Sequence, residues 1–122
     1  MRRVLKPTVL AALAVLALTA AGRADELSGE AVFQKYCFSC HTTNGMNRVG
    51  PHLRGIVGRH SAAVGSFEYS AAMKESDITW TEDVLDAYLT APARMVPGTK
   101  MIFAGVADPA ERAALIAYLK SR

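Results

Sequence analysis

The five residues Cys37-Phe38-Ser39-Cys40-His41 use both cysteines of this 122-residue chain and place a histidine directly after them. Two thiols three positions apart, followed at once by an imidazole, match the attachment motif of a c-type haem. Each thiol can add across one vinyl group of the porphyrin to form a thioether, and the adjacent imidazole then reaches the iron as an axial ligand. The motif therefore predicts one haem c, covalently attached through Cys37 and Cys40, with His41 bound to the iron.

Three other uses of the two cysteines compete with haem attachment. A thioredoxin-like redox pair would follow a strand of a βαβ unit, and no strand pattern precedes Cys37. A structural zinc site would need further ligands, and only His52 and His60 are left, outside any second Cys/His cluster. A disulfide between Cys37 and Cys40 would close a loop too short to stabilise the chain much. The motif together with its context favours haem attachment over these three uses.

The first 24 residues have the parts of a secretory signal peptide. Three basic residues lie among the first six, an almost wholly Ala, Leu and Val run covers residues 9–21, and small residues precede Asp25. The apolar run is short for a membrane span, which disfavours the alternative of an uncleaved anchor. We expect residues 1–24 to be removed on export and residues 25–122 to form one domain in the periplasm.

Removal of the signal peptide changes the charge of the protein. Four of the 14 basic residues lie within residues 1–24, whereas all 11 acidic residues lie beyond them. The remaining chain then has ten basic and 11 acidic side chains, a net charge of −1, although the full sequence has a pI near 9.1. Because no basic stripe survives export, we expect no binding to nucleic acid.

Helical patterns dominate residues 25–122, and strand signals are poor. The first three patterns cover residues 28–36, 70–75 and 81–90. Ser28 and Thr81 are suitable N-caps for the first and third, and Pro92 stops the third. The patterns predict a small all-α domain of about four to five helices with Gly/Pro-rich loops. A long loop at residues 42–66, which includes Gly50-Pro51, is more typical of a ligand-wrapping segment than of a plain connection.

The last helical pattern has the clearest start. Asp108 can cap it, Pro109 takes the first helical position and Glu111 completes a capping box. Its apolar face is formed by Leu115, Ile116, Tyr118 and Leu119. Gly29 and Phe33 of the first helix are the expected partners of that face, because a glycine permits a close crossing and an aromatic ring fills the gap beside it.

An electron-carrying haem needs a second axial ligand besides His41. The candidate sulfur and imidazole side chains are Met46, Met73, Met95, Met101, His52 and His60. Most methionines fill gaps in a core, and Met46 lies too near the attachment motif to cross easily to the other haem face. Met101 is distinguished by its irregular setting, Pro97-Gly98-Thr99-Lys100-Met101, in which a loop can bring a side chain to the haem.

The chain resembles the class I cytochromes c of the mitochondrial-like and bacterial cytochrome c2 type over nearly all of residues 28–122. Besides the attachment motif, the matching parts are Gly50-Pro51-His52-Leu53-Arg54-Gly55, Gly58-Arg59, Thr79-Trp80, Tyr88-Leu89, Pro92, residues 97–103, and Leu115-Ile116-Ala117-Tyr118-Leu119-Lys120. Several independent motifs in the right order carry the resemblance, which implies the small single-domain cytochrome c fold around one haem.

The resemblance also implies a set of haem-binding residues. It makes Met101 the sixth ligand, so that His41 and Met101 are the metal ligands, and the carbonyl of Pro51 accepts a hydrogen bond from the His41 ring. The other implied contacts are Arg59, Tyr69 and Trp80 at the buried propionates, and Tyr88 and Thr99 on the methionine side. A carboxylate held away from water does need an arginine or several neutral donors.

The sequence departs from the family pattern in several places. Met73 stands where an asparagine is common, which puts a buried polar network in doubt, and the loop after His41 is about two residues shorter than in mitochondrial members. Tyr36 and Ala93 occupy positions where lysines are frequent. The basic residues that remain for a docking ring are Lys35, Lys74, Arg94 and Lys100, near the apolar pair Ile102-Phe103.

These observations favour a soluble, exported one-electron carrier that is not an enzyme. The expected partners are redox proteins, namely a membrane oxidase, a bc1-type complex or a dehydrogenase; we expect a monomer without stable membrane insertion of the mature chain. The alternative is a haem-based peroxidase or small-ligand-binding cytochrome, which requires an open sixth position and, for peroxidase chemistry, a distal acid/base group such as His52 or His60. A subunit permanently docked in a larger complex is a third possibility and would show a large exposed apolar patch.

Overall fold

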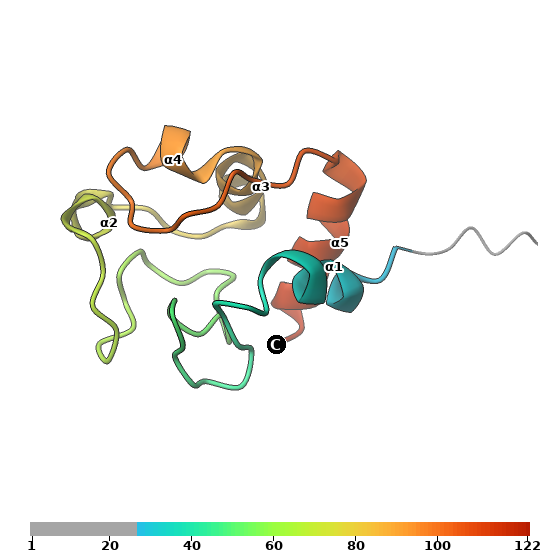
Figure 1. The fold of residues 1–122 in the computed structure, drawn as a ribbon, viewed down its shortest axis with the longest axis horizontal. Coiled ribbons are helices and arrows are strands. Elements are labelled where there is room, and N and C mark those ends of the chain that lie inside the picture. The colour runs from blue at the N-terminus through green and yellow to red at the C-terminus, as the bar shows by residue number, and fades with distance from the viewer. Residues whose placement is uncertain (1–26) are drawn as a thin grey trace, which may run out of the picture.

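The computed structural model describes residues 27–122, so the predicted signal peptide lies outside the described residues. Within that range the chain forms five helices, which Figure 1 labels. The only strand-like pairing in these described residues is an isolated bridge between His60 and Thr79. The helices are α1 (Gly29–Tyr36), α2 (Ala71–Glu75), α3 (Glu82–Thr90), α4 (Pro92–Met95) and α5 (Pro109–Lys120). The prediction of a small all-α domain with about four to five helices is confirmed.

Side-chain caps fix the start of four helices, because each satisfies a backbone N–H that has no partner within the helix. Ser28, Ser70 and Thr81 accept from the N–H three residues ahead, at 3.3, 3.1 and 3.2 Å. Asp108 accepts from the N–H of Ala110 at 2.8 Å. The expected caps Ser28, Thr81 and Asp108 are confirmed.

The prediction for Pro92 was incomplete. Helix α3 ends at Thr90 as expected, but Pro92 then opens α4, a four-residue helix that was not predicted. Proline suits the first position of a helix because its missing N–H would have no helical partner there. The proline that stops one helix therefore starts the next, and α4 leads directly into the segment that carries Met101.

Helices α1 and α5 cross closely, as the sequence predicts (Figure 1). A Cβ atom on Gly29 would lie 2.6 Å from Cβ of Tyr118 and closer still to the carbonyl oxygen of Ala114. The Phe33 and Tyr118 rings lie beside this crossing with their centroids 5.6 Å apart. The crossing needs a glycine on α1, and it holds the end of α1, where the attachment motif begins, against α5.

The segment after Met101 returns to α3 at a second close approach. Gly105 has φ +114°, and a Cβ atom there would lie 2.9 Å from the carbonyl oxygen of Leu89. The next residue, Val106, is fully buried and its N–H donates to the same carbonyl oxygen at 2.7 Å. This contact fixes one end of the chain stretch that contains Met101.

The long loop predicted at residues 42–66 contains no helix and is drawn in green in Figure 1. Its hydrogen bonds lead back to the attachment motif and to Trp80. The N–H of Gly50 donates to the carbonyl of Cys40 at 2.8 Å, and the N–H of Gly58 donates to the carbonyl of Trp80 at 2.8 Å.

In the described range, no helix is both long enough and apolar enough to cross a bilayer.

Candidate functional site

A cavity of about 630 Å³ lies between α1, α3, α5 and the loops, and its lining is mainly apolar. Ligand sites in proteins have volumes of about 300–1,000 Å³, so the cavity can hold a large cofactor. All ten site residues expected from the sequence line it: Cys37, Cys40, His41, Pro51, Arg59, Tyr69, Trp80, Tyr88, Thr99 and Met101. The structure therefore brings together residues that span 65 positions of the sequence.

The attachment motif forms a tight turn at the end of α1. The N–H of Cys37 caps the helix by donating to Phe33, and the N–H of His41 donates to the carbonyl of Cys37 at 2.9 Å. Neither cysteine is in a disulfide. Burial, with a smaller contribution from Cys40, raises the pKa of the Cys37 thiol to about 11. Thioredoxin-like pairs depress the pKa of a thiol, so the environment of Cys37 is of the opposite kind.

The imidazole of His41 is oriented by the loop that follows it. Its Nδ1 lies 2.7 Å from the carbonyl oxygen of Pro51, and since a carbonyl only accepts, Nδ1 carries the proton and donates. This leaves Nε2 as the free ligating atom. Burial lowers the pKa of His41, against the opposing effect of Pro51, and so favours the neutral imidazole that binds metals. A Cβ atom on Gly50 would lie 2.5 Å from Cε1 of His41, so only a glycine lets the loop approach the ring.

Met101 is held by polar neighbours at another part of the lining. The hydroxyl of Tyr88 donates to the Met101 sulfur at 3.8 Å, and the N–H of Met101 donates to the hydroxyl of Thr99 at 3.3 Å. Burial raises the pKa of Tyr88 to about 12, despite a hydrogen bond with Thr99 that acts in the opposite direction. The Tyr88 hydroxyl therefore keeps its proton near neutral pH and can donate it to sulfur.

A third group of lining residues can receive carboxylates. The guanidinium of Arg59 donates to the carbonyls of His52, at 2.9 Å, and Arg54. Partial burial lowers the pKa of Arg59 from its usual value. The hydroxyl of Tyr69 accepts from the N–H of Val64 at 3.2 Å and so keeps its own proton for another partner, and the indole of Trp80 is buried. A fixed guanidinium beside two N–H or O–H donors suits an acidic group held away from water.

The other methionines and histidines divide between the cavity, a second cavity and the surface. Met73 also lines the haem-sized cavity, whereas the side chain of Met46 is 67% exposed. His60 contributes to the lining, but its Nε2 lies 3.0 Å from Asp77, which raises the pKa of His60. His52 lies beside Arg59, with Nδ1 at 3.4 Å from its guanidinium.

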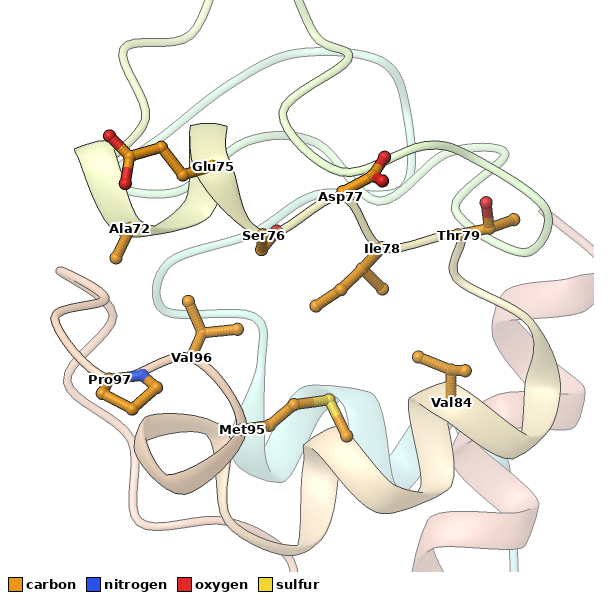
Figure 2. A pocket seen from close by; sticks show the side chains of 10 residues that line it. All are labelled: Ala72, Glu75, Ser76, Asp77, Ile78, Thr79, Val84, Met95, Val96 and Pro97. Carbon is orange, nitrogen blue, oxygen red and sulfur yellow. The ribbon is translucent and has the colours of Figure 1, made fainter.

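A second cavity of about 660 Å³ lies between α2, α3 and α4, and Figure 2 shows the ten residues that line it. Met95, Val96 and Val84 point into this space, while the carboxylates of Glu75 and Asp77 point away from it (Figure 2). Its lining contains no cysteine or histidine. Met95 therefore faces a different cavity from the one that His41 lines. Across residues 27–122, no three His, Cys, Asp or Glu side chains gather into a possible metal site.

The sequence reasoning expected the apolar pair Ile102-Phe103 near the docking ring but did not identify the rest of the apolar lining of the haem-sized cavity. Leu53, Ile56 and Leu115 line it, and so do Val49 and Ile102, two highly exposed side chains. Val49 directly precedes Gly50-Pro51 and Ile102 directly follows Met101. Their position next to motif residues was the available signal.

The attachment motif, a mainly apolar cavity of cofactor size, and imidazole and thioether side chains on its lining together define a c-type haem protein with an all-α fold. Residues 27–122 match the family model described as cytochrome c. The chain belongs to the cytochrome c family, as a class I member, and carries one covalent haem c; its role is electron transport. The cofactor predicted from the cysteine motif is confirmed.

Named relatives agree with this assignment. The chain is 50% identical over 112 residues to cytochrome c2 from Blastochloris viridis, covering 88% of this chain and 87% of that protein. It is also 50% identical over 97 residues to cytochrome c-type cyt cy from Rhodobacter capsulatus, covering 80% of this chain but 49% of that protein, so it spans about half of that relative's length. Among solved structures, cytochrome cH from Methylobacterium extorquens matches with a TM-score of 0.73 and 40% identity, over 77% of this chain and 95% of that one.

Proposed function

We propose that the protein is a one-electron carrier, exported to the periplasm, whose single haem c has His41 and Met101 as axial ligands. The observation that carries the proposal is that both side chains line one cavity together with Cys37 and Cys40. When bound, the haem supplies the iron that takes up and releases the electron. Cys37 and Cys40 anchor it through thioethers.

Neighbouring residues hold the two axial ligands in their roles. The Pro51 carbonyl fixes the His41 tautomer and makes the imidazole a better donor to iron. The Tyr88 hydroxyl holds the Met101 thioether by its bond to sulfur. A methionine paired with a histidine raises the reduction potential, and rigid ligands keep reorganisation small when the electron moves.

Arg59, Tyr69 and Trp80 are proposed to bind the haem propionates. The guanidinium of Arg59 is already fixed by two backbone carbonyls, so little side-chain freedom remains to be lost when a carboxylate binds. Its positive charge would stabilise a propionate where water is excluded.

The peroxidase or small-ligand alternative has less support in the geometry. Both ring nitrogens of His60 already face oxygen acceptors, Nε2 towards Asp77 and Nδ1 towards the carbonyl of Ser61. Absorption spectra of the oxidised and reduced protein separate the two functions. A weak sulfur-to-iron charge-transfer band in the oxidised protein supports the carrier, and a high-spin spectrum would overturn it.

Both cysteines are expected to be consumed by thioether bonds. Mass spectrometry of the exported protein should give the mass of a chain that begins near Asp25 plus one haem. Thiol-reactive reagents should label neither Cys37 nor Cys40 after denaturation. A labelled cysteine, or a Cys37–Cys40 disulfide in the mature protein, would argue against this attachment.

The docking site for redox partners is proposed to be the cavity mouth at Val49 and Ile102. Their exposed fractions are 76% and 101%, so an approaching partner would meet apolar side chains next to the haem.

The basic ring expected around this edge is largely paired within the chain. Lys35 pairs with Glu111 at 2.8 Å and Lys74 pairs with Glu68 at 2.7 Å, while Lys100 donates to the backbone carbonyl of Glu68. Apolar contact should therefore contribute more to docking than charge.

This surface predicts a shallow dependence of electron transfer on salt. The second-order rate constant for oxidation by a membrane fraction with cytochrome oxidase activity should fall by less than about tenfold from low to physiological ionic strength, the lower limit of strong electrostatic steering. Lys100→Glu should lower the rate at low salt, whereas Lys120→Glu, away from the cavity lining, should not. If the rate constant changes neither with salt nor in Lys100→Glu, charge makes no contribution to docking. If the rate constant falls a hundredfold from low to physiological ionic strength, charge dominates docking.

A further inference from the structure

Tyr36 links three parts of the chain at the rim of the haem cavity. It is the last residue of α1 and lines the cavity. Its hydroxyl donates to Oε2 of Glu111, in the first turn of α5, at 2.7 Å. Its ring centroid lies 6.0 Å from that of Phe103, with the planes inclined at 59°, a tilted aromatic contact. Phe103 follows Met101 by two residues, so the contact reaches the segment that carries the proposed sixth ligand.

Lys35 and Glu111 fix the position of the Tyr36 hydroxyl. Nζ of Lys35 lies 2.8 Å from Oε1 of Glu111 and 4.7 Å from the centre of the Tyr36 ring. The Glu111 side chain is only 14% exposed, and its bonds with Lys35 and Tyr36 hold its pKa below the usual value. The carboxylate therefore stays ionised, and a charge-assisted hydrogen bond restrains the rotation of the tyrosine.

The segment beyond Met101 has few other restraints. Among the described residues, positions 102–105 make no backbone–backbone hydrogen bond, and the side chain of Ile102 is fully exposed. The next backbone anchor along the chain is the bond from Val106 to Leu89. A side-chain contact with the ring of Phe103 can therefore restrain this stretch, and the aromatic residue that makes such a contact is Tyr36.

We propose that Tyr36 is a positioning residue for the methionine ligand. Held by Glu111, it packs against Phe103 and keeps the segment 101–103 against the haem pocket, which disfavours the state in which Met101 has left the iron. The inference rests on the proposed Met101 ligation and adds a residue on α1 that controls how firmly the ligand is held.

Imidazole competition on the haem-loaded ferric protein tests the inference, because added imidazole binds the iron only when the methionine leaves. Tyr36→Leu removes the ring contact and should raise the apparent imidazole affinity about threefold to tenfold, the range expected from one aromatic pair. It should also lower the pH at which the sulfur-to-iron band disappears. Tyr36→Phe keeps the ring and loses only the bond to Glu111, so its imidazole affinity should lie between those of Tyr36→Leu and the wild type.

Tyr118→Leu is the matched control. Tyr118 also packs across α1 and α5, against Phe33, but it does not line the cavity. Both leucine variants should lower the denaturant midpoint, and only Tyr36→Leu should change imidazole affinity. An unchanged affinity in Tyr36→Leu, or equal changes in both variants, would overturn the positioning role while leaving Met101 as the ligand. A wild-type protein without the sulfur-to-iron band would instead overturn Met101 ligation, and this inference with it.

Discussion

Met101→Ala is expected to abolish the sulfur-to-iron charge-transfer band of the oxidised protein. The variant loses the thioether whose sulfur accepts a hydrogen bond from the Tyr88 hydroxyl at the cavity, while the bond from the N–H of residue 101 to Thr99 is retained. Because a soft thioether favours reduced iron more than water or hydroxide does, the reduction potential should fall by roughly 0.1 V or more, within the range of about 0.8 V that axial ligands span. The vacated position should also bind azide in the oxidised protein and carbon monoxide in the reduced protein.

Two other methionines supply the controls for Met101→Ala. Met73 lines the same cavity and is the strongest competitor, whereas Met95 lines the second cavity. Met73→Ala and Met95→Ala should both keep the band and most of the potential. If Met101→Ala retains the wild-type spectrum while Met73→Ala or Met95→Ala loses it, the assignment of the sixth ligand is wrong.

The helix starts were predictable because their signals are local. Ser28, Thr81 and Asp108 each bind a backbone N–H two or three residues away, so the chemistry lies within one short window of sequence. Helix α4 was missed because a proline can both end the preceding helix and occupy the first position of a following one. Whether a second helix follows depends on the path of the chain after Pro92, and that path is set by the whole fold.

The site could be predicted where its residues lie in short motifs, and less well where it depends on contacts between distant side chains. The ten expected residues line one cavity. They could be predicted because each lies in a short motif or matches a position of the family that the chain resembles. The pairing of Lys35 with Glu111 spans 76 positions and no local pattern indicates it. Glu111 was expected to complete a capping box; in the structure, its two carboxylate oxygens accept from Lys35 and Tyr36 of α1. The charge available for docking is therefore smaller than a count of lysines suggests.

Gly29→Ala is expected to be the most destabilising single methyl addition at the α1–α5 crossing. In an open helix, replacing glycine by alanine gains up to about 1 kcal/mol, and less at the first helical position that Gly29 occupies. Here the new Cβ would meet the backbone carbonyl of Ala114 and the Cβ of Tyr118, neither of which can rotate away. Overpacking of this kind costs about 1–3 kcal/mol, so steric strain exceeds the gain in helix propensity.

Gly65→Ala is the matched control, because a Cβ atom at Gly65 would meet nothing within 4 Å and the residue does not have a positive φ. Denaturant unfolding of the haem-loaded variants should show a loss of about 1–2 kcal/mol for Gly29→Ala and a change within about 0.5 kcal/mol for Gly65→Ala. For a domain of this size, 2 kcal/mol corresponds to a fall in Tm of roughly 8–16 °C. Since α1 ends at the attachment motif, a displaced α1 would also move Cys37 relative to α5, and the yield of haem-loaded protein should fall with stability. Equal stabilities of the two variants would show that the helices can separate freely, and that the close crossing does not hold the attachment motif in place.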